Sequence, residues 1–257
     1  MLKSVPELSL EDFTEGNEAE KADFSEQLYE GLTHFGFVIL TDHGIAPDFL
    51  STAYECAEAF FSQSRDLKMQ CDAGPDGQRG YTAYGREHAK DAVAADLKEF
   101  WHVGREFTPD DPLASLYPPN QWPDEPTDFK NTFLKLYDAL ECAGLEMLDA
   151  LAPKLSLRPE YFRDMATGGN SILRLLHYPP VPEDAAPGAI RAAAHEDINL
   201  ITILVAANGA GLELLDRNGE WLAIETAPEN LIVDAGDMLA RITNDTIPAT
   251  THRVVNP

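Results

Sequence analysis

Hydrophobic positions in the first half of the chain recur at the spacing of helices. Residues 17–34 and 47–71 show this spacing among acidic side chains, and residues 127–151 carry the strongest apolar face. A short apolar run at 35–40 predicts one buried strand between the first two helices. Residues 73–90 are rich in Gly, Arg and Tyr, which predicts a long loop of the kind that often carries function.

From residue 170 the pattern changes to short apolar runs separated by Asn, Asp, Gly and Pro. Such runs predict an all-β sandwich or barrel. We therefore expect a single domain over 1–257 of mainly β, α+β class, in which a helical part at 1–165 supports a jelly-roll part at 166–257. The predicted strands cover 171–178, 195–205, 211–215, 221–224, 231–233, 238–242 and 250–254.

Charge and composition exclude several kinds of partner. The 257 residues include 19 Lys and Arg against 44 Asp and Glu, a net charge of −25 that repels a phosphate backbone, so we expect no nucleic-acid partner. No apolar run is long enough to span a bilayer, and the first twenty residues lack a secretory pattern, so we expect no membrane association. Three scattered cysteines favour a cytoplasmic protein. No heptad or long apolar edge indicates an oligomeric state.

The candidate chemistry begins at Ala194-His195-Glu196-Asp197. On a strand, residues i and i+2 point to the same side, so His195 and Asp197 would project together. An imidazole beside a carboxylate suits a divalent transition metal. His252, on another predicted strand, is the candidate third ligand. Two histidines and one carboxylate leave three positions of an octahedral iron open. A His-x-Asp pair alone is common, and taken by itself it favours a histidine at the edge of the core beside a surface aspartate.

Other segments give this pair a context. In chain order they are Gly36-Phe37-Val38, His43-Gly44-Ile45, Arg79-Gly80-Tyr81, Asp96-Leu97-Lys98-Glu99, Leu173-Arg174, His177-Tyr178-Pro179-Pro180, His195-Glu196-Asp197, Gly211-Leu212-Glu213, Gly219-Glu220-Trp221, Ala235-Gly236-Asp237-Met238-Leu239 and His252-Arg253-Val254-Val255-Asn256-Pro257. In order and spacing, the chain from about Phe35 onward resembles the isopenicillin N synthase-like family of iron(II) and 2-oxoglutarate dependent oxygenases.

The resemblance implies a double-stranded β-helix core with iron(II) on His195, Asp197 and His252. It also implies 2-oxoglutarate and O2 as co-substrates, and a small-molecule substrate that is hydroxylated or desaturated. Tyr178 stands where the family often has a tyrosine that contacts 2-oxoglutarate, and Arg174 where it often lines the substrate pocket. A core-edge tyrosine and a structural salt bridge explain Tyr178 and Arg174 equally well.

Further residues are weaker candidates. Tyr81 and Arg86 lie in the Gly-rich loop, which approaches the active site in the family, and we expect them to bind substrate or to be solvated. Asn199 is expected to hydrogen-bond groups around the metal or to pack. Asp237 is expected to form a turn between strands. Neither Arg241 nor Arg253 has the family's spacing for a co-substrate arginine.

One part of the family pattern lies beyond the sequence. An Arg-x-Ser motif, whose arginine pairs with 2-oxoglutarate, follows the segment that ends at Pro257, so we expect the jelly-roll part to lack its C-terminal end here. Two alternatives therefore stay open. One is an iron-dependent oxidase of the same fold that does not use 2-oxoglutarate, and the other is a non-catalytic binding protein.

Overall fold

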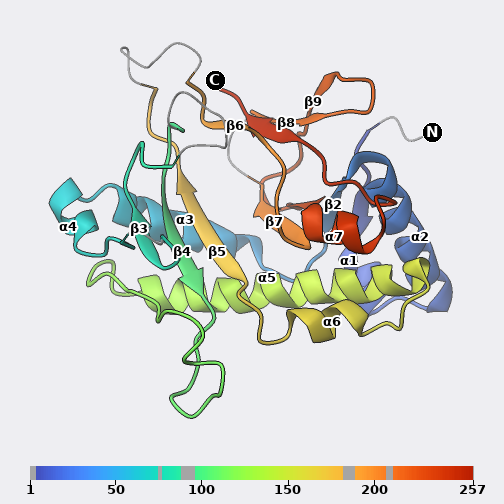
Figure 1. Ribbon diagram of the computed structural model, residues 1–257, viewed down its shortest axis with the longest axis horizontal. Coiled ribbons are helices and arrows are strands. Elements are labelled where there is room, and N and C mark those ends of the chain that lie inside the picture. The colour runs from blue at the N-terminus through green and yellow to red at the C-terminus, as the bar shows by residue number, and fades with distance from the viewer. Residues whose placement is uncertain (1–3, 75–76, 88–95, 182–188, 207–210, 257) are drawn as a thin grey trace. The chain divides into compact units, whose positions relative to one another are not determined.

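A computed structural model describes residues 4–74, 77–87, 96–181, 189–206 and 211–256 (Figure 1). Its strands are β1 Glu7–Ser9, β2 Phe37–Thr41, β3 Gly80–Thr82, β4 Glu99–Gly104, β5 Ile172–His177, β6 Ala192–His195, β7 Ile201–Val205, β8 Leu212–Leu215, β9 Trp221–Ala223, β10 Leu231–Ala235 and β11 His252–Val254. Its helices are α1 Leu10–Thr14, α2 Glu18–Phe35, α3 Pro47–Phe61, α4 Arg65–Met69, α5 Phe129–Leu151, η1 Ala152–Leu155, α6 Tyr161–Ala166 and α7 Asp237–Ile242. The packing divides the chain into two compact units.

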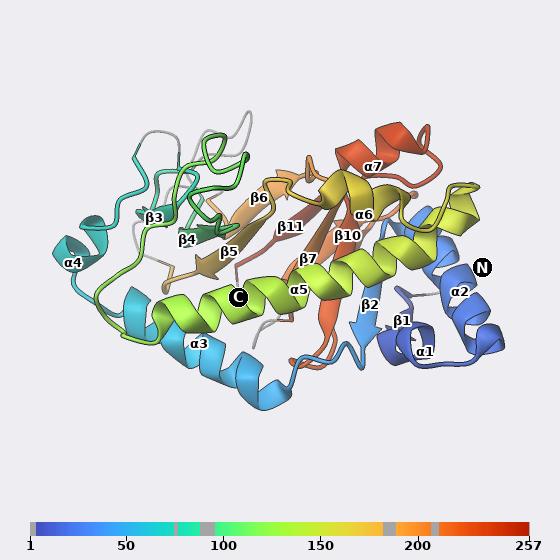
Figure 2. The same cartoon turned by 90° about the horizontal axis from the view of Figure 1, so that it is seen from below.

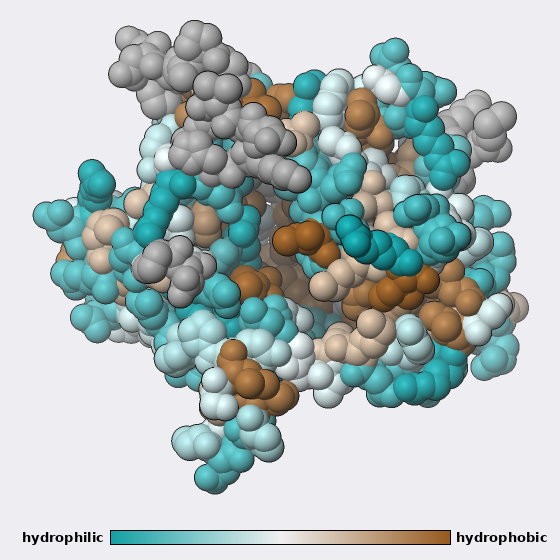
Figure 3. Space-filling view, in the orientation of Figure 1, coloured by the Kyte–Doolittle hydropathy of each residue, from teal (hydrophilic) through white to brown (hydrophobic). Residues whose placement is uncertain are grey.

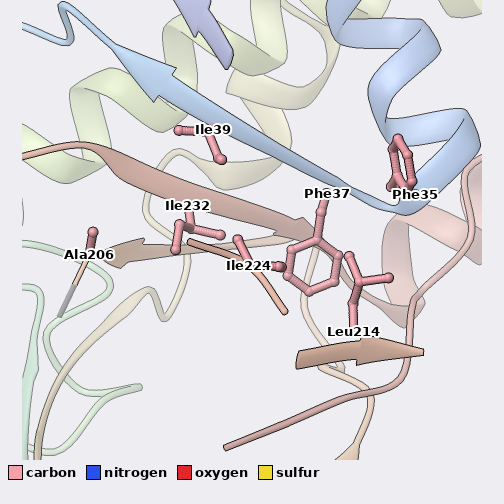
Figure 4. Packing of buried hydrophobic residues seen from close by; sticks show 7 residues of the cluster. All are labelled: Phe35, Phe37, Ile39, Ala206, Leu214, Ile224 and Ile232. Carbon is pink, nitrogen blue, oxygen red and sulfur yellow. The ribbon is translucent and has the colours of Figure 1, made fainter. Parts of the chain in front are cut away.

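The first unit comprises Met1–Ile45, Leu140–Met165 and Ala193–Pro257. It contains two four-stranded sheets, of order β1-β2-β10-β7 and β6-β11-β8-β9. Apolar side chains from both sheets form one core cluster, in which Phe37 of β2 points toward Leu214 of β8 (Figure 4). Two sheets that share an apolar core in this way form the expected jelly-roll arrangement.

Local signals fix the junction between α2 and β2. The side chain of Asn17 accepts hydrogen bonds from the amides of Ala19 and Glu20, and the Glu20 carboxylate accepts one from the Asn17 amide, which completes a capping box. Gly36 ends the helix at φ 70°, a left-handed conformation that favours glycine. A Cβ at Gly36 would also lie 2.3 Å from Thr250 Oγ1, so this turn requires glycine for space as well.

The prediction of a single strand over 195–205 is wrong, because residues 196–200 between β6 and β7 do not form a strand. The carbonyl oxygens of Asp197, Asn199 and Leu200 accept hydrogen bonds from the amides of Asp237, Met238 and Gly236, at 2.7, 3.1 and 3.1 Å. These carbonyls therefore bond to the start of α7 instead of a neighbouring strand.

The predicted strand over 238–242 is also wrong, because these residues form most of α7. Leu239 and Ala240 are buried while Met238 and Arg241 are exposed, which is helical and not strand periodicity. A short apolar run does not distinguish the two structures. Asp237 accordingly begins this helix and does not form a turn between strands.

The second unit comprises Ala46–Ala139 and Ala166–Ala192 and contains the antiparallel sheet β3-β4-β5 (Figure 2). The central strand β4 is buried along its whole length, and the sequence pattern did not predict it. On one face of this sheet, Trp101 packs against Phe60 and Phe129, with ring centroids 4.8 and 5.0 Å apart. The helix predicted over 47–71 is interrupted before Ser64, whose hydroxyl caps α4.

A buried ionic cluster ties α4 to the same face of β4. Lys68 Nζ lies 2.8 Å from both carboxylate oxygens of Glu99, and His177 Nδ1 lies 2.8 Å from one of them. The Tyr81 hydroxyl donates a further hydrogen bond to Glu99. Although burial raises the pKa of Glu99, its bonds to His177, Lys68 and Tyr81 lower that pKa to about 2. Glu99 is therefore ionised and fully paired.

The surface is mainly hydrophilic, as expected for a chain with 25% charged residues. On the face drawn in Figure 3, hydrophilic residues cover most of the area and hydrophobic ones form separate small patches. Across the described residues, none of the helices is both long and apolar enough to cross a membrane.

Candidate metal centre

Two neighbouring strands of the first unit bring the predicted metal ligands together. His195 is the last residue of β6, His252 is the first of β11, and β6 and β11 are adjacent in their sheet. Asp197 lies in the segment between β6 and β7. It lies two residues after His195, before the bend at residues 199–200.

The three side chains converge on one point. Asp197 Oδ1 lies 3.6 Å from His195 Nε2 and 3.9 Å from His252 Nε2. One ligand atom from each residue lies within 4.8 Å of the others, so a small movement of the side chains would bring them to the roughly 3 Å that separates ligand atoms on one side of an ion with bonds of about 2 Å. The rings of the two histidines are 4.5 Å apart between centroids and inclined at 53°.

Hydrogen bonds to the main chain fix which ring nitrogens are free. His195 Nδ1 donates to the carbonyl of Ala193 at 2.7 Å, and His252 Nδ1 donates to that of Thr250 at 3.2 Å. In a neutral imidazole the other nitrogen, Nε2, then carries the lone pair. Burial, together with the nearby His195, lowers the pKa of His252 and favours this neutral form. Both Nε2 atoms therefore have a lone pair available for binding a metal.

The carboxylate of Asp197 is oriented by its neighbours. The Thr202 hydroxyl donates to Asp197 Oδ2, which leaves Oδ1 toward the histidines. Asn199 Nδ2 donates to Thr202 Oγ1 at 2.9 Å, so Asn199 acts on the site through Thr202. The main chain of Asp197 is held by the start of α7, where a Cβ at Gly236 would lie 2.9 Å from the Asp197 carbonyl oxygen.

Asp234 is a second carboxyl group of this unit, buried on β10. Only 1% of the residue is exposed, and neither carboxyl oxygen has a hydrogen-bond partner in the described part of the chain. Burial raises the pKa of Asp234 well above its ordinary range, and the charge of Asp197 raises it further. Asp234 is paired in register with Thr202 of β7 and Phe37 of β2, and Phe37 packs edge-on against His252.

This donor set fits a transition metal. Two neutral imidazoles and one carboxylate on one side of an ion leave the opposite positions open, which is the arrangement of non-haem iron(II) oxygenases. Among the described residues, no other group of three or more such side chains meets the same criterion.

The other predicted site residues belong to the second unit. Arg174 Nε donates to His102 Nε2 at 2.7 Å, and its Nη1 lies 3.5 Å from Glu87 Oε1. Tyr178 follows β5, with the guanidinium of Arg191 over its ring at 5.6 Å, and burial raises the pKa of its hydroxyl.

Tyr81 and Arg86 each have a partner within their own unit. Tyr81 is 2% exposed and donates to Glu99. Arg86 binds Asp72 at 2.9 Å and the carbonyl of Gly74 at 2.8 Å.

Arg253 is engaged in the first unit. It binds Glu213 with both Nε and Nη2 at 2.7 Å and stacks on Trp221 at 3.9 Å. These contacts agree with its exclusion as a co-substrate arginine.

Sequence reasoning did not find Thr202, Asp234 or His102. Thr202 lies on a predicted strand, but its bond to Asp197 depends on the bend between β6 and β7. Asp234 interrupts an apolar run at Leu231–Ala235, which is the one signal that marks it. His102 carries no signal in the sequence, since its role depends on the pairing of β4 with β5.

Comparison with known proteins assigns the chain. Residues 5–125 match the family model described as non-haem dioxygenase in morphine synthesis N-terminal. Residues 169–257 match that of the 2OG-Fe(II) oxygenase superfamily. A 2-oxoglutarate-Fe(II) type oxidoreductase of Aspergillus fumigatus is 30% identical over 92% of this chain and 73% of its own length. The 2-oxoglutarate-dependent dioxygenase citB of Monascus ruber is 32% identical over 87% of this chain and 71% of its own length.

Solved structures agree with this assignment. A 2OG-Fe(II) oxygenase family structure from Caulobacter crescentus is 39% identical, with a TM-score of 0.88, over 100% of this chain and 81% of that one. A full-length Neurospora crassa protein solved in complex with alpha-KG is 32% identical, with a TM-score of 0.87, over 98% of this chain and 79% of that one. The expected fold class, cofactors and reaction class are thereby confirmed. The chain belongs to the isopenicillin N synthase-like group of the 2OG-Fe(II) oxygenase superfamily, and its relatives are 2-oxoglutarate-Fe(II) type oxidoreductases and 2-oxoglutarate-dependent dioxygenases.

Proposed function

We propose that His195, Asp197 and His252 are the iron(II) ligands of this dioxygenase. The observation that carries the proposal is the convergence of one ligand atom from each residue within 4.8 Å, with both Nδ1 atoms engaged by main-chain carbonyls. Bound iron(II) would couple the decarboxylation of 2-oxoglutarate to succinate with oxidation of a substrate C–H bond. The protein's contribution is to orient the three ligands and leave the remaining positions open.

We further propose that Tyr178 contacts 2-oxoglutarate. Lys98, Arg174 and Arg191 all act electrostatically on its hydroxyl, opposed by Asp96. Lys98 is paired with Glu87 and Asp96, and Arg174 with Glu87, so the guanidinium of Arg191 over the Tyr178 ring is the positive charge that suits a dicarboxylate ligand. Replacing Tyr178 by Phe is expected to raise the 2-oxoglutarate concentration needed for half-maximal succinate formation.

For the substrate, we propose a small molecule that Arg174 contacts. The similar Neurospora crassa protein was also solved with alpha-KG and thymine, which makes free thymine a reasonable first probe. The contacts of Tyr81 with Glu99 and of Arg86 with Asp72 favour a role in shaping the loop over direct substrate contact. The net charge of −25 supports a partner other than nucleic acid. Three free thiols support a cytoplasmic setting.

The experiment measures succinate formation and oxygen uptake in wild type, Asp197→Asn and Glu196→Gln. Glu196 is the matched control because it is the adjacent carboxylate and binds the Thr251 hydroxyl. We expect 2-oxoglutarate-dependent turnover in wild type and Glu196→Gln and its loss in Asp197→Asn. Oxygen uptake without 2-oxoglutarate would contradict the proposal, as would full activity of Asp197→Asn.

A further inference from the structure

The second unit contains a cavity of about 500 Å³, a size that small-molecule sites commonly have. The chain that follows β4, the first half of α5 and the turn after α6 line it. The apolar side chains of Phe107, Leu113 and Leu134 form one part of its wall, and charged side chains form another. A cavity of this mixed kind suits a ligand with both an apolar part and a charged part.

Arg105 provides the positive charge in this wall. Its Nε donates to the Gly169 carbonyl at 3.4 Å, and its guanidinium lies over the ring of Tyr137, 5.9 Å from the centroid. Tyr137 is 5% exposed, and its hydroxyl donates to the Ser171 carbonyl at 3.2 Å. A main-chain carbonyl and a buried ring therefore fix the position of the Arg105 guanidinium.

Arg79 places a second, buried cation near Arg105. Only 3% of Arg79 is exposed, and its guanidinium lies against Gly104, the residue before Arg105, where a Cβ would be 2.0 Å from Arg79 Cζ. Arg79 donates to the Gln78 carbonyl and to Asn170 Oδ1, both neutral groups, at 2.7 Å. Within the described ranges its Nε has no hydrogen-bond partner, and Arg79 takes part in no ion pair. A buried cation without a carboxylate is costly, so this part of the cavity favours an anionic group.

Asp138 on α5 provides a carboxylate in the same cavity. Among the residues that the structure describes, it forms no hydrogen bond and no ion pair. The other two carboxylates of the wall are engaged. Asp111 accepts from the amide of Leu113 at 2.8 Å, and Glu106 lies 3.5 Å from Lys130 Nζ. Asp138 is therefore the carboxylate that suits a positive group of a ligand.

We propose that this cavity binds a small zwitterion, an amino acid with an apolar side chain. The carboxylate of the ligand binds Arg105, its ammonium group binds Asp138, and its side chain packs against the apolar part of the wall. Both charges of the ligand are then paired, and its carboxylate also compensates the buried charge of Arg79. None of these residues is an iron(II) ligand or a substrate contact in the proposed function.

Calorimetry with three probes that share one apolar group tests the proposal on the full chain. L-Leucine carries both charges, 4-methylpentanoate lacks the ammonium group, and 3-methylbutylamine lacks the carboxylate. Wild type should bind L-leucine at least about tenfold more tightly than either analogue, because both ionic contacts form only with leucine. The leucine affinity should be unchanged in His195→Ala, whereas its loss in that variant would place the probe at the metal centre and overturn the proposal.

Two variants assign the ionic contacts. Arg105→Met should weaken L-leucine binding about tenfold and leave 3-methylbutylamine binding unchanged. Asp138→Asn should weaken L-leucine binding about tenfold and leave 4-methylpentanoate binding unchanged. Lys135→Met is the control, because it removes an exposed charge from the same helix and should leave all three affinities unchanged. The proposal is overturned if wild type does not bind L-leucine, if it binds the three probes equally, or if either variant weakens all three probes alike.

Discussion

At Asp197 the two carboxylate oxygens face different partners. Oδ1 faces the histidines, while Oδ2 accepts from Thr202, which is itself held by Asn199. The hydroxyl of Thr202 therefore determines which oxygen of Asp197 is presented to the metal. Residues that do not bind a metal commonly set its affinity in this way.

Thr202→Val should weaken metal binding about tenfold, because Asp197 loses the bond that orients it. Thr202→Ser keeps the hydroxyl and should bind as wild type does. Titration with iron(II) under anaerobic conditions measures both affinities. Equal affinity in wild type and Thr202→Val would show that the hydroxyl does not orient the ligand.

The pH dependence of stability should report on His102. Burial and the charge of Arg174 lower its pKa to about 4, from about 6.5 in the unfolded chain. Between these values the unfolded chain binds more protons, so stability falls as pH decreases. Wild type should lose about 2 kcal/mol from this group between pH 7 and pH 5, and His102→Gln should lose correspondingly less. If the free energy of unfolding fell by the same amount between pH 7 and pH 5 in wild type and His102→Gln, the lowered pKa of His102 would be contradicted.

Among the elements, α7 supports the metal centre through its first turn. Its initial amides bond to the carbonyls of Asp197 and Asn199, and this contact leaves no space for a side chain at Gly236. The segment between β6 and β7 is thus held in its bend by a helix and not by a strand partner.

Gly236→Ala should displace this segment, since the new Cβ would lie 2.3 Å from the Asn199 carbonyl oxygen. We expect a loss of about 2 kcal/mol in the free energy of unfolding, together with weaker iron binding. Met238→Ala is the control in the same helix, because Met238 is 57% exposed and the substitution keeps the hydrogen bond from the main-chain amide of residue 238 to the Asn199 carbonyl. Denaturant unfolding and iron titration measure the two effects. Equal stability and equal iron affinity in Gly236→Ala and Met238→Ala would contradict this role of α7.

The ion pair between α4 and β4 should stabilise the second unit. Lys68→Met would leave Glu99 buried with only His177 and Tyr81 as partners, at a cost of about 3 kcal/mol. Arg158→Met removes an exposed ion pair and should change unfolding little. An unchanged midpoint in denaturant for Lys68→Met would contradict this role.

The sequence predicts long elements well and short ones poorly. The helix predicted over 127–151 is α5, Phe129–Leu151, which begins two residues later than predicted and ends at the predicted residue. The run Met238–Ile242 predicts a strand, although its four apolar residues and Arg241 fit the spacing of a helix as well, and the structure forms the helix α7 there. The break between β6 and β7 could not be predicted, because its cause is a contact with α7 about forty residues later in the chain.

At the scale of the whole molecule, the resemblance of ordered motifs identified the family and the candidate triad. It did so because metal ligands need fixed residue types at fixed places in the fold. The residues that orient Asp197 and Arg174 depend on strand register and chain bends, which one sequence does not determine. The residues that recognise the substrate are likewise not determined by the sequence alone, since one fold hosts many functions.

The most direct test of the metal centre is an anaerobic titration with iron(II) and 2-oxoglutarate, monitored by the weak visible charge-transfer absorbance of the chelate. Wild type and His195→Ala are compared, with a folding check by circular dichroism. We expect the absorbance in wild type and its loss in a folded His195→Ala protein. Absence of iron binding in wild type, or the same absorbance in both proteins, would contradict the assignment of His195, Asp197 and His252 as the metal centre.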